Sequence, residues 1–153
     1  LEQSRKLGTF GHGYTYTAHP VGCAIALKVI EIYERDKVME NAARVSNVFQ
    51  SRLKAMADHP LVGEARGEGL IGAIELVADK KTKRSFDFKK GIGAATARMI
   101  EDLGLIVRNV QDTIAFCPPL IITTDEVHAM FDIVEKGLDQ MEAHVRKEGL
   151  RTA

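Results

Sequence analysis

The sequence predicts a small mixed fold of the α/β class, an α+β domain in which an antiparallel or mixed sheet packs against helices. Apolar residues recur every three or four positions in four segments, as amphipathic helices require. Stretches rich in β-branched residues lie between these segments and are typical of paired strands. The 153 residues, 45% apolar and 27% charged, suffice for a packed core. The helical segments are 21–33, 38–56, 92–103 and 127–145, and the strand-forming stretches are 61–78 and 105–117.

The N-terminal part should be a glycine-rich loop followed by helix. Residues 8–20 hold three glycines, three threonines and three aromatic residues but no acidic residue, Lys or Arg, which is typical of a loop with a short extended stretch. Pro20 suits the first turn of a helix, and His59 with Pro60 ends the helical pattern that follows. This pattern fits either one kinked helix or two helices.

The first strand pair should lie within residues 61–78, as two short strands around a glycine turn. Residues 79–90 carry six Lys or Arg residues without periodicity, which predicts a solvated loop. The helix over residues 92–103 should end at Gly104, because glycine favours the left-handed cap of a helix.

The second strand pair is expected at residues 105–110 and 113–117, with Gln111 and Asp112 as the turn. After it, Thr123 is followed three residues later by Glu126. This spacing is a capping-box signature and predicts the start of a long final helix.

The charge balance excludes several classes of function. Lys plus Arg and Asp plus Glu both number 21, so no positive excess favours nucleic acid. No apolar run approaches the roughly 18 residues of a membrane helix, and no signal peptide opens the chain. We therefore expect a cytoplasmic protein that binds neither nucleic acid nor membranes. Cys23 and Cys117 stand alone in the sequence and should be reduced thiols.

Short motifs of known chemistry are largely missing. Residues 67–72 match GxGxxG, but residues 73–77 after them suit a strand, whereas a dinucleotide site needs a helix there. We interpret these glycines as a turn or bulge. Phosphate-binding P-loops, GxSxG and HExxH do not occur, and the five histidines lack the spacing of metal ligands, so we expect no metal site.

Two polar features remain as candidate sites, each with a plainer alternative. Residues 8–17 could present hydroxyl and backbone N–H groups to an anion through Thr9, Thr15 and Thr17 and three glycines, but spacing alone favours a simple strand. Arg108 shares one strand face with Ile106 and Val110. Its guanidinium could bind a carboxylate ligand through two parallel bonds, whereas the plainer alternative is a structural ion pair or an exposed strand face.

Three ordered motifs resemble the class III aminotransferases, enzymes that use pyridoxal phosphate. The resemblance spans nearly the whole chain, and the GHGYTY form and Arg108 are similar to the omega-amino acid or amine:pyruvate branch. The ornithine-type branch usually has Gly-Gly-Asn-Pro where this chain has Thr-Ala-His-Pro. The motifs are GHGYTYTAHP with GCAIAL at 11–27, RGEGLIGAIEL at 66–76, and GLIVR at 104–108 with FCPPLIIT at 116–123.

The resemblance implies the C-terminal portion of a homodimeric fold-type-I transferase that moves an amino group from an amine or omega-amino acid to a keto acid such as pyruvate. Residues 1–36 would be a remnant of the large cofactor-binding domain, with an inter-subunit loop and a connecting helix. Residues 37–153 would form the small C-terminal domain. Tyr14 and Thr15 would bind the cofactor phosphate across the dimer interface, and Arg108 the substrate carboxylate.

The resemblance places no catalytic residue in this chain. The lysine that binds the cofactor covalently should lie shortly upstream of Leu1, and Lys6 is too close to residues 12–15 to be its counterpart. The chain alone is therefore expected to be inactive. One alternative from a different class stays open: a stand-alone α+β domain that binds a small carboxylate through Arg108, or dimerises through residues 8–36, without catalysis.

Overall fold

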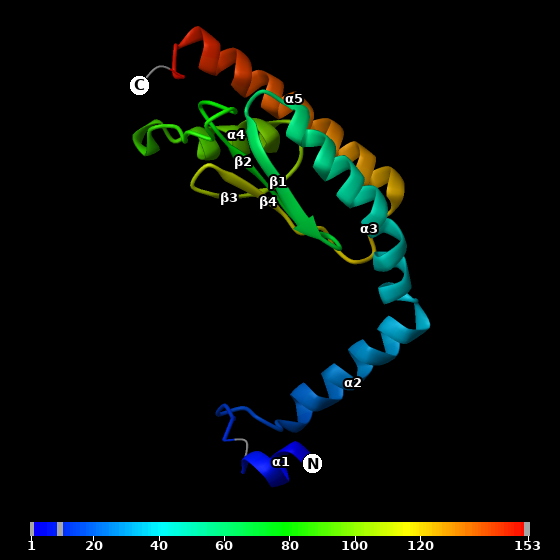
Figure 1. Cartoon of the computed structure of the whole chain (residues 1–153). Coiled ribbons are helices and arrows are strands. Elements are labelled where there is room, and N and C mark those ends of the chain that lie inside the picture. The colour runs from blue at the N-terminus through cyan, green and yellow to red at the C-terminus, as the bar shows by residue number, and fades with distance from the viewer. Residues whose placement is uncertain (1, 9–10, 152–153) are drawn as a thin grey trace. The chain divides into compact units, whose positions relative to one another are not determined.

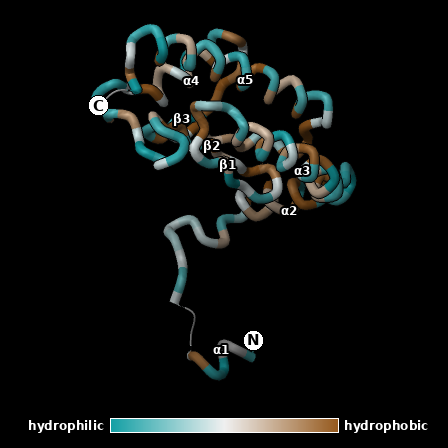
Figure 2. Tube along the Cα trace, turned by 45° about the horizontal axis from the view of Figure 1, so that its top comes forward, coloured by the Kyte–Doolittle hydropathy of each residue, from teal (hydrophilic) through white to brown (hydrophobic). Residues whose placement is uncertain are grey.

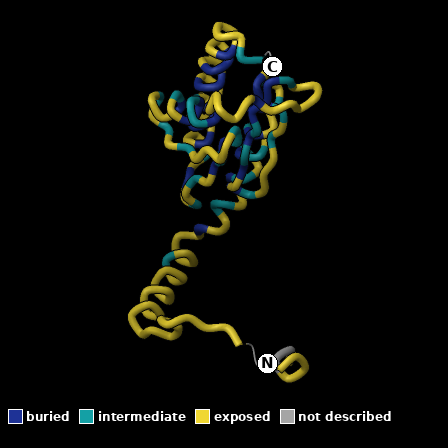
Figure 3. Tube along the Cα trace, turned by 90° about the vertical axis from the view of Figure 1, so that its left-hand side faces the viewer, coloured by how far each residue is buried: buried dark blue, intermediate teal, exposed yellow. Residues whose placement is uncertain are grey.

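The chain forms two compact units, Leu1–Lys37 and Val38–Ala153, in a computed structural model that describes residues 2–8 and 11–151. The first unit contains helix α1 (Glu2–Leu7) and helix α2 (Pro20–Arg35) (Figure 1). No residue of α2 is buried. Figure 3 shows that the described residues of this unit are exposed almost throughout, whereas buried residues gather in the second unit.

The helical pattern after Pro20 belongs to two helices. Pro20 begins α2 in its first turn, as predicted. Lys37 has a φ of 51°, in the left-handed region that a helix cannot continue through. Helix α3 (Val38–Ala55) starts immediately afterwards, at a buried valine.

The second unit places three long helices on a four-stranded sheet. All neighbouring strands are antiparallel, in the order β1-β2-β4-β3. Helix α3 packs on β1 and β2, α4 packs on β3 and β4, and α5 lies beside both α3 and α4 (Figure 1). The elements after α3 are η1 (Met56–Asp58), β1 (Val62–Glu68), β2 (Ile71–Leu76), η2 (Phe88–Lys90), α4 (Ile92–Asp102), β3 (Arg108–Val110), β4 (Thr113–Phe116) and α5 (Thr124–Lys147). This arrangement confirms the predicted α+β fold.

The core lies between the sheet and the helices. Phe131 of α5 contacts Phe49 of α3 and Phe116 of β4, at ring-centroid distances of 5.3 and 5.6 Å. Gly72 lets α3 approach β2 closely, because a Cβ there would lie 2.5 Å from Leu53 Cδ2. Figure 2 shows hydrophobic and hydrophilic residues alternating along α3 and α5, as expected of helices with one buried side.

Most of the predicted turns and caps are present. Gly104 ends α4 at a φ of 97°, with its N–H bonded to Glu101 O and that of Leu105 bonded to Ile100 O. The Thr123–Glu126 capping box is formed as predicted. The strand predicted at 105–110 is wrong at its start, because β3 begins only at Arg108.

Residues 79–90 form the predicted loop, which is exposed for most of its length but buries Phe86 in the core and contains the short η2 helix. Among the described residues, no helix is both long and apolar enough to cross a membrane.

Candidate substrate and cofactor sites

Arg108 lies at the start of the edge strand β3, on the exposed face of the sheet. It pairs with Ala115 of β4. Leu105 and Val107 are half-buried against the core, while Ile106 is 85% exposed, so the chain alternates and Arg108 shares the outer face with Ile106, as predicted. No described residue forms a hydrogen bond or an ion pair with the Arg108 side chain. Its position agrees with the alternative of an exposed strand face and not with that of a structural ion pair. The guanidinium is still able to bind a carboxylate ligand.

An apolar groove of about 760 Å³ opens beside Arg108. Its walls are residues 105–108, residues 115–122 except Leu120, and the first turns of α5. Phe116 of β4 also lines the groove, and it is buried with its ring 5.6 Å from that of Phe131. Arg108 and Glu126 are the only charged residues among those that line the groove.

Glu126 is already engaged as a helix cap. Its Oε2 accepts hydrogen bonds from the Thr123 N–H and hydroxyl, each at 2.8 Å. The bond from the Thr123 backbone, followed by that from its side chain, lowers the pKa of the Glu126 carboxyl. Arg108 is therefore the charged group of this groove that is left to bind a ligand, and the ligand it favours is an anion with an apolar part.

Helix α4 holds the segment that carries Arg108 at both ends. Before β3, the cap of α4 bonds the Leu105 N–H to Ile100 O at 3.2 Å. After β3, the Asp112 carboxylate accepts the N–H of Gly93, at the start of α4, at 2.9 Å. The Asp112 carbonyl also accepts the N–H of Leu76 in β2 at 2.9 Å.

The sequence predicts Asp112 only as a turn residue and does not predict these bonds. Burial raises the pKa of Asp112, and the nearby charge of Glu75 adds to this effect, while the hydrogen bond from Gly93 opposes it. Asp112 follows Gly93 by nineteen residues. At this separation no local sequence pattern indicates that the two residues are bonded.

Tyr14 and Thr15 lie in the exposed segment before α2, which forms a turn and no strand. The Thr17 hydroxyl oxygen accepts the Tyr14 N–H at 2.6 Å, and the Thr17 N–H donates to Tyr14 O at 2.9 Å. Ala18 follows with a φ of 61°. The strand that spacing favoured here is therefore wrong, because the Tyr14 N–H bonds the Thr17 side chain and not a neighbouring strand.

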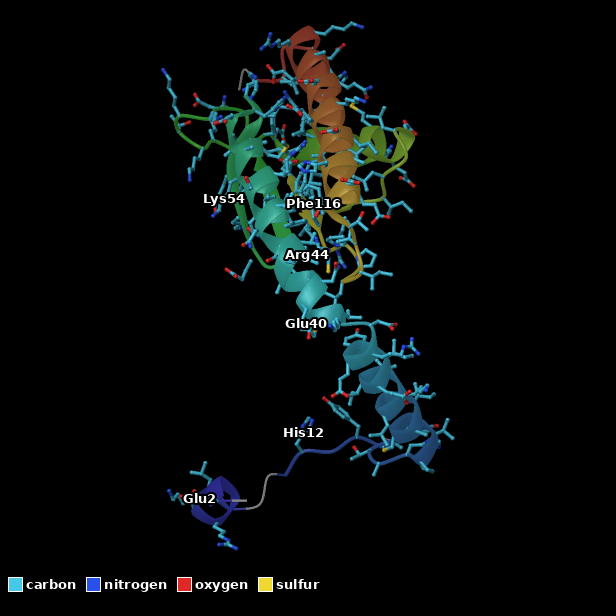
Figure 4. The ribbon with its side chains drawn as sticks, turned by 90° about the vertical axis from the view of Figure 1, so that its right-hand side faces the viewer. Glu2, His12, Glu40, Arg44, Lys54 and Phe116 are labelled. Atoms are coloured by element: carbon cyan, nitrogen blue, oxygen red, sulfur yellow. The ribbon has the colours of Figure 1, made fainter. Side chains whose placement is uncertain are left out.

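The turn leaves hydroxyl groups exposed. Tyr14 is 77% exposed, and its ring lies 5.0 Å from that of His12, the residue labelled in Figure 4. Among the described residues, the Thr15 hydroxyl has no hydrogen-bond partner. Tyr14 and Thr15 are adjacent donors in the first unit, whereas Arg108 belongs to the second unit.

No cluster of three His, Cys, Asp or Glu side chains suited to a metal ion occurs in residues 2–8 and 11–151. Cys23 and Cys117 are free and exposed.

Comparison with known proteins identifies relatives over nearly the whole chain. Residues 2–138 match the family model described as aminotransferase class-III. The gamma aminobutyrate transaminase 1 of Solanum lycopersicum, a mitochondrial protein, is 41% identical over 145 residues, which are 95% of this chain and 28% of the relative. The putrescine–pyruvate aminotransferase of Pseudomonas aeruginosa is 42% identical over 139 residues, 90% of this chain and 30% of the relative.

Solved structures agree with these matches. The omega-transferase of Vibrio fluvialis JS17 superposes with a TM-score of 0.83 at 40% identity, covering 95% of this chain and 35% of that chain. The PMP-bound form of an aminotransferase from Vibrio fluvialis gives a TM-score of 0.82 at 40% identity, over 94% and 32% of the two chains. This chain thus spans about a third of the length of the relatives it matches.

Proposed function

Because this chain belongs to the class III aminotransferases, we propose that it is the C-terminal part of an enzyme that moves an amino group from an amine or omega-amino acid to a keto acid such as pyruvate. In this proposal Arg108 binds the carboxylate of the keto acid. The rest of the enzyme supplies the lysine that binds the cofactor covalently, and the active enzyme is a homodimer. Residues 1–36 then belong to the large domain and residues 37–153 to the small one.

The observation that carries the proposal is the unpaired guanidinium of Arg108 at the edge of an apolar groove. A guanidinium fork binds a carboxylate through two parallel, charge-assisted bonds, and no described acid competes for it. Since the side chain makes no bond that must be broken, it can turn away when an uncharged amine occupies the same place. One pocket can in this way serve both half-reactions.

Class III aminotransferases use pyridoxal phosphate, which supplies an electron sink for amino-group transfer when it is bound. The residues around the first turn fit its phosphate end. Thr15 offers a hydroxyl that no described residue uses, and residues 11–20 contain no acid that would repel a phosphate. We therefore assign Tyr14 and Thr15 to the phosphate, as donors that reach a cofactor bound by the partner subunit.

The test of Arg108 is the Arg108→Met variant in the full-length enzyme. Methionine keeps the length of the side chain and removes the fork, so kcat/KM for pyruvate should fall about a hundredfold. The value for a simple aryl or alkyl amine should change far less. The half-reactions are measured separately, with Arg98→Met, another exposed arginine of this unit, as the matched control. Equal losses for both substrates would instead assign Arg108 a structural role in the fold.

The cofactor assignment is tested by Thr15→Val, which removes a donor to a dianion at nearly constant volume. Cofactor affinity should fall about tenfold or more, because a hydrogen bond to a charged group contributes about 1.5–3 kcal/mol. Titration of the apoenzyme with pyridoxal phosphate measures this. Thr15→Ser, which keeps the hydroxyl, should bind nearly as the parent does, and unchanged affinity in the valine variant would remove Thr15 from the site.

A further inference from the structure

Strand β3 is a weak support for a side chain that must meet a ligand accurately. It has three residues, all exposed, and it pairs on one side only, with β4. Short edge strands with few buried contacts open easily. The position of Arg108 therefore depends on what holds the ends of the strand.

The end after β3 is held more closely than an ordinary hairpin turn. Gly93 accommodates the turn because it has no side chain: a Cβ there would lie 1.9 Å from the carbonyl oxygen of Gln111. Gln111 itself has a φ of 54°. With the two bonds of Asp112, to Gly93 and to Leu76, the turn is fixed to both α4 and β2.

We infer that Asp112 is a positioning residue for the reaction, one that fixes Arg108 for its carboxylate ligand by bonding the β3–β4 turn to the start of α4. This inference rests on the proposed function, since it assigns Arg108 the carboxylate. Asp112 contacts no ligand itself, and its effect reaches the ligand through the three residues of chain that separate it from Arg108.

The bond requires a short side chain with an acceptor oxygen, and it does not require a charge. Asn presents the same oxygen at the same length as Asp. Burial already raises the pKa of Asp112, so a neutral amide suits its surroundings at least as well. Asp112→Asn should therefore keep Arg108 in place, whereas Asp112→Ala removes the acceptor and leaves the N–H of the buried Gly93 without a partner.

The experiment compares these two variants in the full-length enzyme. Asp112→Ala should raise KM for pyruvate about tenfold while kcat/KM for a plain amine stays within about twofold, and Asp112→Asn should behave as the parent does. The rate of hydrogen exchange of the amides of residues 108–110 is a second readout. This rate should rise in the alanine variant only. If Asp112→Ala does not fold, Asp112→Ser, whose shorter side chain weakens the bond, takes its place.

Each variant is repeated in the Arg108→Met background. Asp112→Ala should add nothing to KM for pyruvate there, because the positioned side chain is gone. An equal rise in both backgrounds, or no rise and no change in exchange, would overturn the inference. If Arg108→Met by itself does not lower kcat/KM for pyruvate, the proposed function is overturned instead. The two failures therefore remain distinct.

Discussion

Glu142 is a glutamate that is buried with its side chain ionised. Only 8% of the residue is exposed. It accepts hydrogen bonds from Arg146, one turn further along α5, and from Arg151. Arg151 also donates to the carbonyl oxygen of Ala78 at 2.8 Å. Arg151, at the end of the described chain, thus joins the Glu142 carboxylate of α5 to the loop after β2.

The pKa of Glu142 is set by opposing effects. Loss of solvation raises it, but the hydrogen bonds from Arg146 and Arg151 and their charges together outweigh this and lower it below the ordinary value. A pKa lowered in the folded state means that the unfolded chain takes up the proton first as the pH falls. The stabilisation is therefore present above the ordinary pKa of a glutamate and is lost as the pH falls through the native pKa.

We predict that Glu142→Gln lowers the free energy of unfolding at pH 7 by about 1–3 kcal/mol, because two charge-assisted bonds become weaker. The difference from the parent should shrink as the pH is lowered through the native pKa of Glu142. Denaturant titrations between pH 7 and pH 3 measure this. Glu135→Gln, an exposed change on the same helix, is the control. A difference independent of pH would show that the charge of Glu142 does not stabilise the fold.

At the scale of elements, the N-terminus of α5 is determined by contacts between residues that are close in the sequence. The Thr123 Oγ1 accepts the Glu126 N–H at 3.2 Å, and the Glu126 carboxylate accepts the Thr123 N–H in return. This box ends the irregular residues 117–122 and starts the longest helix of the described chain. Every bond in it joins residues three apart, which is why the sequence predicts it.

We predict that Thr123→Ala lowers the free energy of unfolding by about 1 kcal/mol, the usual cost of losing an N-cap acceptor. Thr123→Ser keeps the acceptor and should lie within a few tenths of a kcal/mol of the parent. Urea unfolding of the three proteins, at equal m-values, gives the comparison. Equal stability of the alanine and serine variants would mean that packing alone starts α5.

Elements that depend on contacts distant in sequence were predicted less well. The strand at 105–110 was expected from its β-branched residues, yet residues 105–107 follow the cap of α4 and do not pair. The strand favoured around Tyr14 fails because the Thr17 hydroxyl takes its N–H. The break between α2 and α3 depends on the left-handed backbone of Lys37. The sequence does not predict this conformation, because the residue is not a glycine.

At the scale of the whole molecule, the sequence suggested the candidate residues but not what positions them. Arg108 and its strand face follow from alternation along a strand. Asp112 and Gly93 could not be paired in advance, because their bond joins the start of α4 to a turn that comes only after the rest of that helix and strand β3. The groove beside Arg108 likewise requires α5, which comes later in the chain.

The core of the molecule is complete within one of its two units. Every buried apolar residue of the described chain lies at Val38 or beyond, and α2 contributes none. Since buried apolar area is the main source of stability, residues before Val38 should add little to it. The isolated α2, with 16 residues, is also near the length at which helices are marginal in water.

We therefore predict that a chain of residues 36–153 unfolds cooperatively with a Tm within about 4 °C of that of residues 1–153, a difference of less than about 1 kcal/mol. The start at residue 36 keeps Val38 away from a charged terminus. Calorimetry and far-ultraviolet circular dichroism of both chains provide the measurement, and Phe131→Ala in each is the control, because loss of a core aromatic residue should lower both Tm values equally. A much lower Tm for residues 36–153 alone would show that the first unit stabilises the second, and the exposed apolar residues of α2 would then have to be counted as part of the core.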